Sequence, residues 1–251
     1  MSQNEIADLV ARAAAAPDDA GGDRRSRQRA LAALIPALTR SAKASGIRAV
    51  TAGRWLADLI IELAPRIAFR DVETLRRQHP GQSDIEIAER LIRQATKATA
   101  GLGAAAGGLA AVEFFSPPML LAAPVQLAAE MLSVTAVELK LVAELHELMD
   151  RPAKGTASER AGAYLTSWMR RRAISPQLGG AGLGAAFGAA AKRELRSQVL
   201  RRIGRSATSL APFLAGAVAG AEVNRRATKA LGETLLAELR GLKEERWFRQ
   251  V

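Results

Sequence analysis

The chain of 251 residues contains no cysteine, and this absence excludes disulfide bonds, thiolate zinc sites and cysteine nucleophiles. Aromatic residues make up only 4% of the chain, while alanine, leucine and arginine are abundant, which favours helix over strand. The first residues lack the basic and apolar regions of a secretory signal. We therefore expect an all-α protein that stays inside the cell.

Long apolar runs are also missing. A spanning helix needs roughly 20 apolar residues, and alanine and glycine contribute little to insertion. The longest uncharged stretch, Ala173–Ala191, is interrupted by Pro176 and is rich in glycine. Three other uncharged stretches are shorter still: Ala98–Val112, Phe114–Ala129 and Ser206–Ala221. We expect no ordinary transmembrane span.

Glycine is present in an ordered way, at intervals of four residues in three uncharged Ala/Gly-rich stretches. Residues four apart share one face of a helix, and each glycine in a helix interior costs about 1 kcal/mol relative to alanine. Such faces are typical of helices whose backbones approach closely. The positions assigned to helix packing are Gly103, Gly107, Gly180, Gly184, Gly188, Gly216, Gly220 and, on the face of the last pair, Asn224.

The order of helix starts and breaks predicts a central Gly/Ala-rich helical hairpin. Ser83 and Glu86 form a capping-box pattern, from which a helix runs into Ala98–Val112. A break at Glu113–Pro118 forms the tip, and a second helix continues to about Met149, with a kink expected at Pro124.

A second Gly-rich helix pair is predicted in the C-terminal part. Shorter helices are predicted before residue 80, at residues 4–16, 55–63 and 67–78. Residues 1–30 are assigned to a variable, partly flexible basic segment, and residues 31–251 to one helical domain.

The net charge of +11 is unevenly distributed. Residues 1–100 carry a net charge of +4, residues 101–150 carry −5, and residues 151–251 carry +12. This asymmetry predicts an anionic partner for the C-terminal third, either anionic lipid or nucleic acid. The alternative is that the basic third packs beside the acidic middle of the same chain.

Arginines flank the two glycine-rich stretches Gly180–Gly188 and Gly216–Gly220, and two tryptophans lie next to arginines in the sequence. Rings next to cations are typical of membrane-interface anchors, although each tryptophan fits core or edge packing equally well. The predicted membrane- or anion-binding residues are Arg170, Arg171, Arg172, Arg193, Arg196, Arg201, Arg202, Trp168 and Trp247.

Motifs for catalysis, cofactors or metals are not found in the sequence, so we expect a protein that is not an enzyme. His146 and Asp150 are one turn apart, which fits a solvated helix end better than a metal site. Glu113, Glu130 and Glu138 stand in apolar surroundings. They either have raised pKa values and a function, or pair with Lys140 or with the basic third, and we favour the pairing.

Three segments within residues 85–246 resemble the EcsC family. They are the Gly-rich stretch Thr99–Gly108, the proline-bearing restart Pro117–Leu120 with its long following helix, and the string Pro212–Asn224. One departure is visible, because Glu113–Ser116 replaces the usual Asp-containing turn. The resemblance implies membrane association and no agreed catalytic activity. The family takes its name from a gene neighbouring an ABC exporter.

Together these features predict a protein bound peripherally to the inner face of the cell membrane. Its partner is an anionic lipid surface or a membrane protein complex, reached through the basic C-terminal third. The alternative is a soluble helical protein-interaction module, an accessory or scaffold protein. Nucleic acid is disfavoured because stacking aromatics are few and because it leaves the glycine ladders unexplained. The sequence is also compatible with a homo-oligomer.

Overall fold

The computed structural model describes residues 3–14, 24–46, 54–113, 122–172 and 213–248, and every regular element within them is helical. The predicted all-α fold is therefore confirmed for this part of the chain. The elements are α1 (Gln3–Ala14), α2 (Arg24–Ser45), α4 (Arg54–Leu63), the 3₁₀ turn η1 (Ala64–Arg66), α5 (Val72–Gln78), α6 (Asp84–Glu113), α7 (Ala122–Leu148), α8 (Ala157–Arg171) and α10 (Phe213–Phe248).

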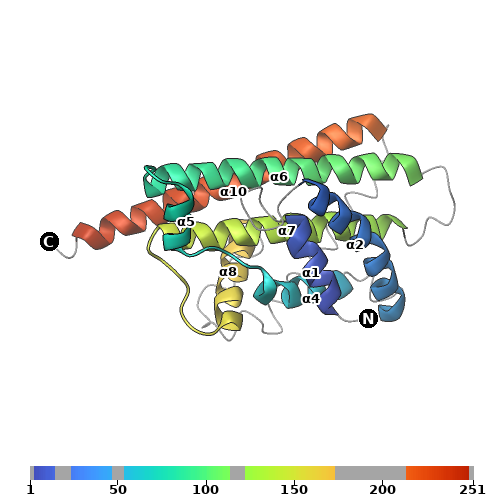
Figure 1. Cartoon of the computed structure of the whole chain (residues 1–251), viewed down its shortest axis with the longest axis horizontal. Coiled ribbons are helices and arrows are strands. Elements are labelled where there is room, and N and C mark those ends of the chain that lie inside the picture. The colour runs from blue at the N-terminus through green and yellow to red at the C-terminus, as the bar shows by residue number, and fades with distance from the viewer. Residues whose placement is uncertain (1–2, 15–23, 47–53, 114–121, 173–212, 249–251) are drawn as a thin grey trace.

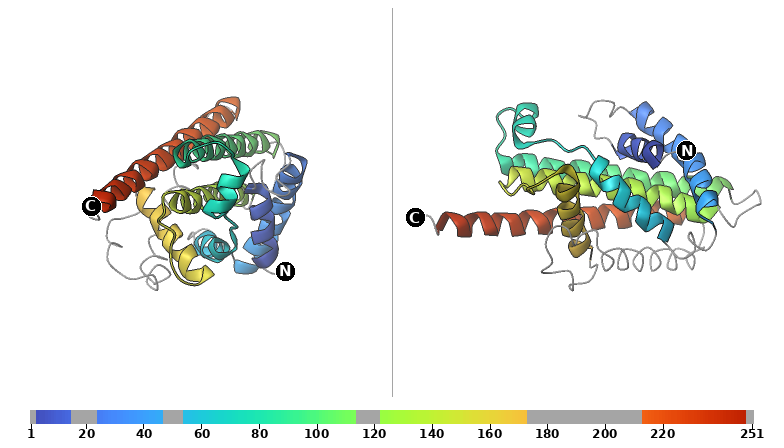
Figure 2. Two further views of the ribbon diagram at one scale, coloured as in Figure 1. Left: turned by 60° about the vertical axis from the view of Figure 1, so that its left-hand side comes forward. Right: turned by 90° about the horizontal axis from the view of Figure 1, so that it is seen from below.

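Helices α6 and α7 form the predicted antiparallel hairpin, and α10 runs back along α6 (Figure 1). Helix α7 lies at the centre, in contact with α1, α2, α4, α5, α6, α8 and α10. Every residue of α7 from Leu132 to Leu139 is buried. The views in Figure 2 show α8 crossing the long helices and the C-terminal end of α10 extending beyond the bundle. The predicted partner of α10 in a second Gly-rich pair falls at 173–212, outside the described residues.

Local capping explains where α6 and α8 begin. The backbone N–H of Ser83 donates to Glu86 Oε2 at 2.7 Å and the N–H of Glu86 donates to Ser83 Oγ at 3.3 Å, as the capping box predicts. Thr156 and Glu159 form the same pair of bonds at 2.7 and 3.3 Å at the start of α8. This second box was not predicted, although its Thr-x-x-Glu spacing is visible in the sequence.

One sequence expectation needs correction, and another stays a prediction. The described part of α7 starts at Ala122, two residues before Pro124, and 114–121 lie outside the described residues, so the kink expected at Pro124 stays a prediction. The predicted helix at 67–78 starts only at Val72, because the side chain of Asp71 accepts the N–H of Thr74 at 2.7 Å and caps it there. None of the described helices combines the length and the hydropathy that crossing a bilayer requires.

Candidate functional site

The carboxylate of Glu138 lies at the junction of α7, α8 and α10 and is fully buried. Trp168 Nε1 donates to its Oε2 at 2.7 Å and Thr228 Oγ1 donates to its Oε1 at 2.6 Å. The guanidinium of Arg172 donates to both oxygens, with Nε 3.0 Å from Oε2. These bonds fill the acceptor positions of a carboxylate. The group therefore joins three helices and has no free position to accept a substrate proton.

The end of α8 supplies two of these donors, because Trp168 and Arg172 are one helical turn apart and project from the same face. Glu138 thus pairs with a cation of the basic third, which confirms the pairing favoured from sequence. Glu130 also meets the basic third, but through an amide, since Asn224 Nδ2 donates to Glu130 Oε1 at 2.7 Å. The side chain of Glu113 lies outside the described residues.

On α10, the face that carries Gly216, Gly220 and Asn224 contains further packing residues beyond Asn224. Asn224 and Thr228 bind α7, and Gly232 follows one turn later. A Cβ added at Gly232 would lie 2.8 Å from Cγ1 of Ile92 on α6, so only glycine fits this approach without displacement. The backbone of α10 thus lies close against a side chain of α6, at a glycine that was not among the predicted packing positions.

Of the predicted packing glycines, the structure describes the burial of one. Gly103 is buried within α6. Gly107, Gly216 and Gly220 belong to α6 and α10, and their contacts lie outside the described part of the structure. Gly180, Gly184 and Gly188 lie outside the described residues altogether. Their packing role stays a prediction.

The arginine triplet at the end of α8 requires a correction. Arg172 binds Glu138, and Arg171 donates to Glu238 at 2.6 Å and to Ser167 Oγ at 2.6 Å, with only 11% of its side chain exposed. Trp168 is buried, so the membrane-anchor interpretation is wrong for it and the core-packing alternative holds. Only Arg170 of the triplet is exposed. Arg193, Arg196, Arg201 and Arg202, and the side chain of Trp247, fall outside the described residues.

A second buried carboxylate, Glu144, ties the segment before α5 to α7. Arg70 donates to it through Nε at 2.8 Å and Nη2 at 2.9 Å, and Lys140 Nζ lies 3.0 Å from Oε1. Only 2% of the Glu144 side chain is exposed. Lys140 therefore pairs with Glu144, one turn further along α7, and not with Glu113, Glu130 or Glu138 as the sequence suggested. Sequence spacing could reveal this pair but not Arg70, which is distant in the chain.

His146 is held between α7 and α8, with Nδ1 3.2 Å from the carbonyl oxygen of Arg151 and Nε2 3.2 Å from Ser167 Oγ. Burial lowers its pKa below the ordinary value, opposed by the bond to Arg151 and reinforced by the charge of Arg171. The predicted solvated helix end is therefore wrong for His146. Among the described residues, no three histidine or acidic side chains are arranged to hold a metal ion.

This lowered pKa predicts a pH dependence of stability. The unfolded chain binds a proton at His146 near pH 6.5, whereas the folded chain does so only at lower pH. Stability is therefore lost as the pH falls from about 6.5 through the folded pKa. His146→Gln, which keeps hydrogen-bonding capacity, should lose less stability between pH 7 and pH 5 than the wild type. Thermal unfolding followed by circular dichroism measures this, and equal losses in both proteins would contradict it.

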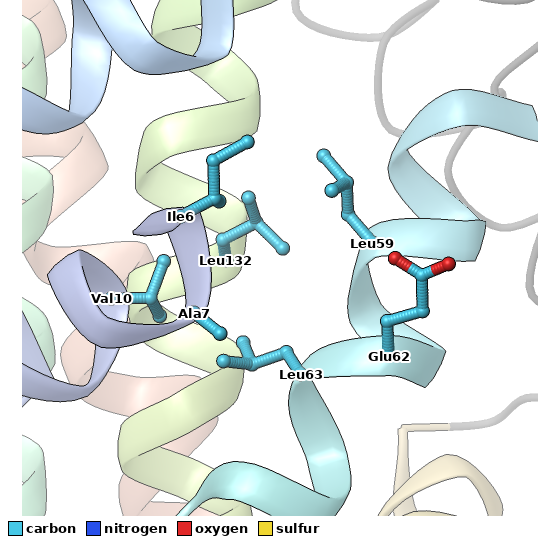
Figure 3. A pocket seen from close by; sticks show the side chains of 7 residues that line it. All are labelled: Ile6, Ala7, Val10, Leu59, Glu62, Leu63 and Leu132. Atoms are coloured by element: carbon cyan, nitrogen blue, oxygen red, sulfur yellow. The ribbon is translucent and has the colours of Figure 1, made fainter. Parts of the chain in front are cut away.

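Two small cavities lie between the short helices and α7. One is bounded by Ile6, Ala7 and Val10 of α1, Leu59, Glu62 and Leu63 of α4, and Leu132 of α7 (Figure 3). The other lies between η1, α7 and α8, beside Phe69 and Tyr164. Each measures about 10 Å³, room for about one water molecule. Neither can enclose a metabolite.

Comparison of the chain with protein-family models, with curated proteins and with solved structures gives no match in any of the three. The resemblance to the EcsC family therefore stays a prediction based on the segments described above.

Proposed function

We propose that this chain is an EcsC-like, non-enzymatic protein that binds the anionic cytoplasmic surface of the cell membrane, or a complex located there. The charge of residues 151–251 supports the proposal, because this third carries 19 basic and 7 acidic residues. Each Lys or Arg near an anionic lipid surface contributes about 1 kcal/mol. A net charge of +12 within one third of a chain thus favours such a surface strongly.

The cations that serve this role are those not committed inside the fold. Arg171 and Arg172 neutralise carboxylates of the protein itself, whereas Arg170 is exposed. The sequence between residues 173 and 212 contains six further basic residues and one acidic residue. Arg193, Arg196, Arg201 and Arg202 are therefore the residues to test, and Arg172 is not, because its replacement leaves Glu138 buried without a counter-charge.

Vesicle sedimentation tests the proposal. The wild type should bind vesicles containing phosphatidylglycerol, should ignore pure phosphatidylcholine, and should be released as salt rises from about 0.05 to 0.5 M, because screening weakens exposed charge interactions. Replacing Arg193, Arg196, Arg201 and Arg202 together by Gln should weaken binding at least tenfold. Equal binding to both lipids, or none to either, contradicts the proposal. A stoichiometric protein partner without vesicle affinity would instead identify an interaction module.

A further inference from the structure

Among the described helices, α2 has the largest excess of basic over acidic residues. Its 22 residues carry six cations and no acidic side chain, and four of the cations stand within its first six residues, at Arg24, Arg25, Arg27 and Arg29. The N-terminus of a helix carries partial positive charge, so cations there are unfavourable for the helix itself. An anionic surface beside α2 would relieve this repulsion.

The side chains of α2 separate into two faces. Ala30, Leu34, Ala37, Leu38 and Ala42 are buried in the core. The opposite face is exposed and includes Arg29, Ala32, Ala33, Pro36, Arg40 and Lys43. Arg29 and Lys43 are separated by about 21 Å along the helix, with small uncharged residues between the cations. The ion pair of Arg40 with Glu5 is 3.6 Å long and about half exposed on each side, so it contributes little to stability.

The location of α2 supplies a second, independent observation. In Figures 1 and 2, α2 lies at the end of the molecule where α6 finishes and α7 begins, and it contacts α7. The sequence at this end is uncharged from Ala98 to Val112 in α6 and from Ala122 to Ala129 in α7. Gly101 and Ala104 of this stretch are exposed. The fold thus brings a basic helix and an uncharged hairpin end together, although they are far apart in the sequence.

We infer that this end of the molecule is the face that docks on anionic phospholipid. The cations of α2 bind lipid phosphates, and the uncharged ends of α6 and α7 lie against the adjoining interface, because amphipathic membrane-surface elements combine these two features. A nucleic acid backbone is recognised by cations and polar donors and would leave the uncharged hairpin end without a role. The inference rests on the proposed function and assigns its orientation.

The C-terminal cations at Arg171 and Arg172 lie elsewhere. Glu138, the partner of Arg172, lies about 24 Å along α7 from the start of that helix at Ala122. Docking through the hairpin end and docking through the end of α8 therefore predict that different cations contribute to vesicle binding. The inference can be tested by neutralising three exposed cations of α2 and, for comparison, three exposed cations outside it.

The first experiment compares two triple variants for binding to phosphatidylglycerol vesicles at low salt. Arg29→Gln, Arg40→Gln and Lys43→Gln remove three exposed cations of α2, and Arg66→Gln, Arg77→Gln and Arg90→Gln remove three exposed cations that lie outside α2 and outside residues 151–251. A contribution of about fivefold per cation predicts up to about 100-fold weaker binding for the α2 variant. The matched variant should stay within about threefold of the wild type. Circular dichroism confirms that both remain folded.

Equal loss in the two variants, or an unchanged affinity of the α2 variant, overturns the inference while leaving the proposed function standing. A wild type without preference for anionic vesicles overturns both. Binding to a DNA duplex that depends on the α2 cations, without vesicle binding, likewise overturns the lipid assignment.

The second experiment reports orientation directly. Because the chain has no cysteine, Ala104→Cys can carry a single environment-sensitive fluorophore at the hairpin end, and Ser158→Cys can carry it at the exposed start of α8. Phosphatidylglycerol vesicles should shift the emission of the Ala104 probe to the blue and leave the Ser158 probe unchanged. A shift at Ser158 without one at Ala104 would reverse the assigned orientation and overturn the inference.

Discussion

Glu138→Ala should destabilise the fold by about 3–5 kcal/mol, because removing one partner of a buried ion pair leaves the other charge uncompensated. Arg172, Trp168 and Thr228 would all lose their acceptor at once. Urea unfolding monitored by circular dichroism gives the free energy of unfolding. The matched control is Glu89→Ala, whose exposed pair with Arg93 spans 3.7 Å, and whose effect should stay within about 0.5 kcal/mol.

A double variant separates the ion pair from simple loss of packing. In Glu138→Met combined with Arg172→Met, neither charge is left unpaired, and apolar replacement of both members of a buried pair is often neutral. The double variant should therefore recover about 2 kcal/mol or more of the loss seen in Glu138→Ala. If Glu138→Ala behaved like the Glu89 control, the buried cluster would not be what joins α7, α8 and α10.

Gly232→Leu should cost about 1–3 kcal/mol, because overpacking a filled interface forces neighbouring groups to move. The first added atom would meet Cγ1 of Ile92 at 2.8 Å, and the branched Ile92 side chain is buried and has little rotamer freedom. The control is Gly241→Leu on the same helix, where an added Cβ has no neighbour within 4 Å. That change should stabilise the helix by up to about 1 kcal/mol, since leucine is a better helix former than glycine.

Ile92→Ala tests the contact from the other side. Combined with Gly232→Leu, it frees space in α6 for the new side chain, so the two changes together should cost less than the sum of their separate costs. Additive costs measured in the same urea experiment would show that Gly232 and Ile92 do not constrain each other. The opposite signs expected at Gly232 and Gly241 also separate close packing from helix propensity.

The ion pairs of Arg171 and Arg172 within the fold change how membrane binding should be studied in this protein. Charge reversal at Arg172 would break the Glu138 pair and so weaken the fold, whatever its effect on lipid. Lost vesicle binding in such a variant would not identify a lipid contact. Exposed cations, such as Arg170, Arg29 and Lys43, separate the two effects because surface substitutions change stability little.

Local patterns predicted the helical elements well. Ser83 and Glu86 marked the start of α6, and the predicted break at Glu113–Pro118 separated the two helices of the hairpin, because capping and helix breaking depend on neighbouring residues. The spacing of Gly216, Gly220 and Asn224 identified the face of α10 that meets α7 at Asn224. It did not identify Gly232, whose importance depends on Ile92, a residue of a different helix much earlier in the chain.

The helical class, the hairpin, the absence of cysteine chemistry and the excess of positive charge can all be predicted from the sequence, because each follows from composition or from residues within a few turns of one another. Which charges are internal and which face outward depends instead on how distant segments pack. Arg170 and Arg172 look alike in sequence, yet one is exposed and the other binds buried Glu138. The same holds for α2, which folding places beside the uncharged hairpin end. The reason is physical: a charge acts through its distance and its burial, and both are set by contacts between segments distant in the chain.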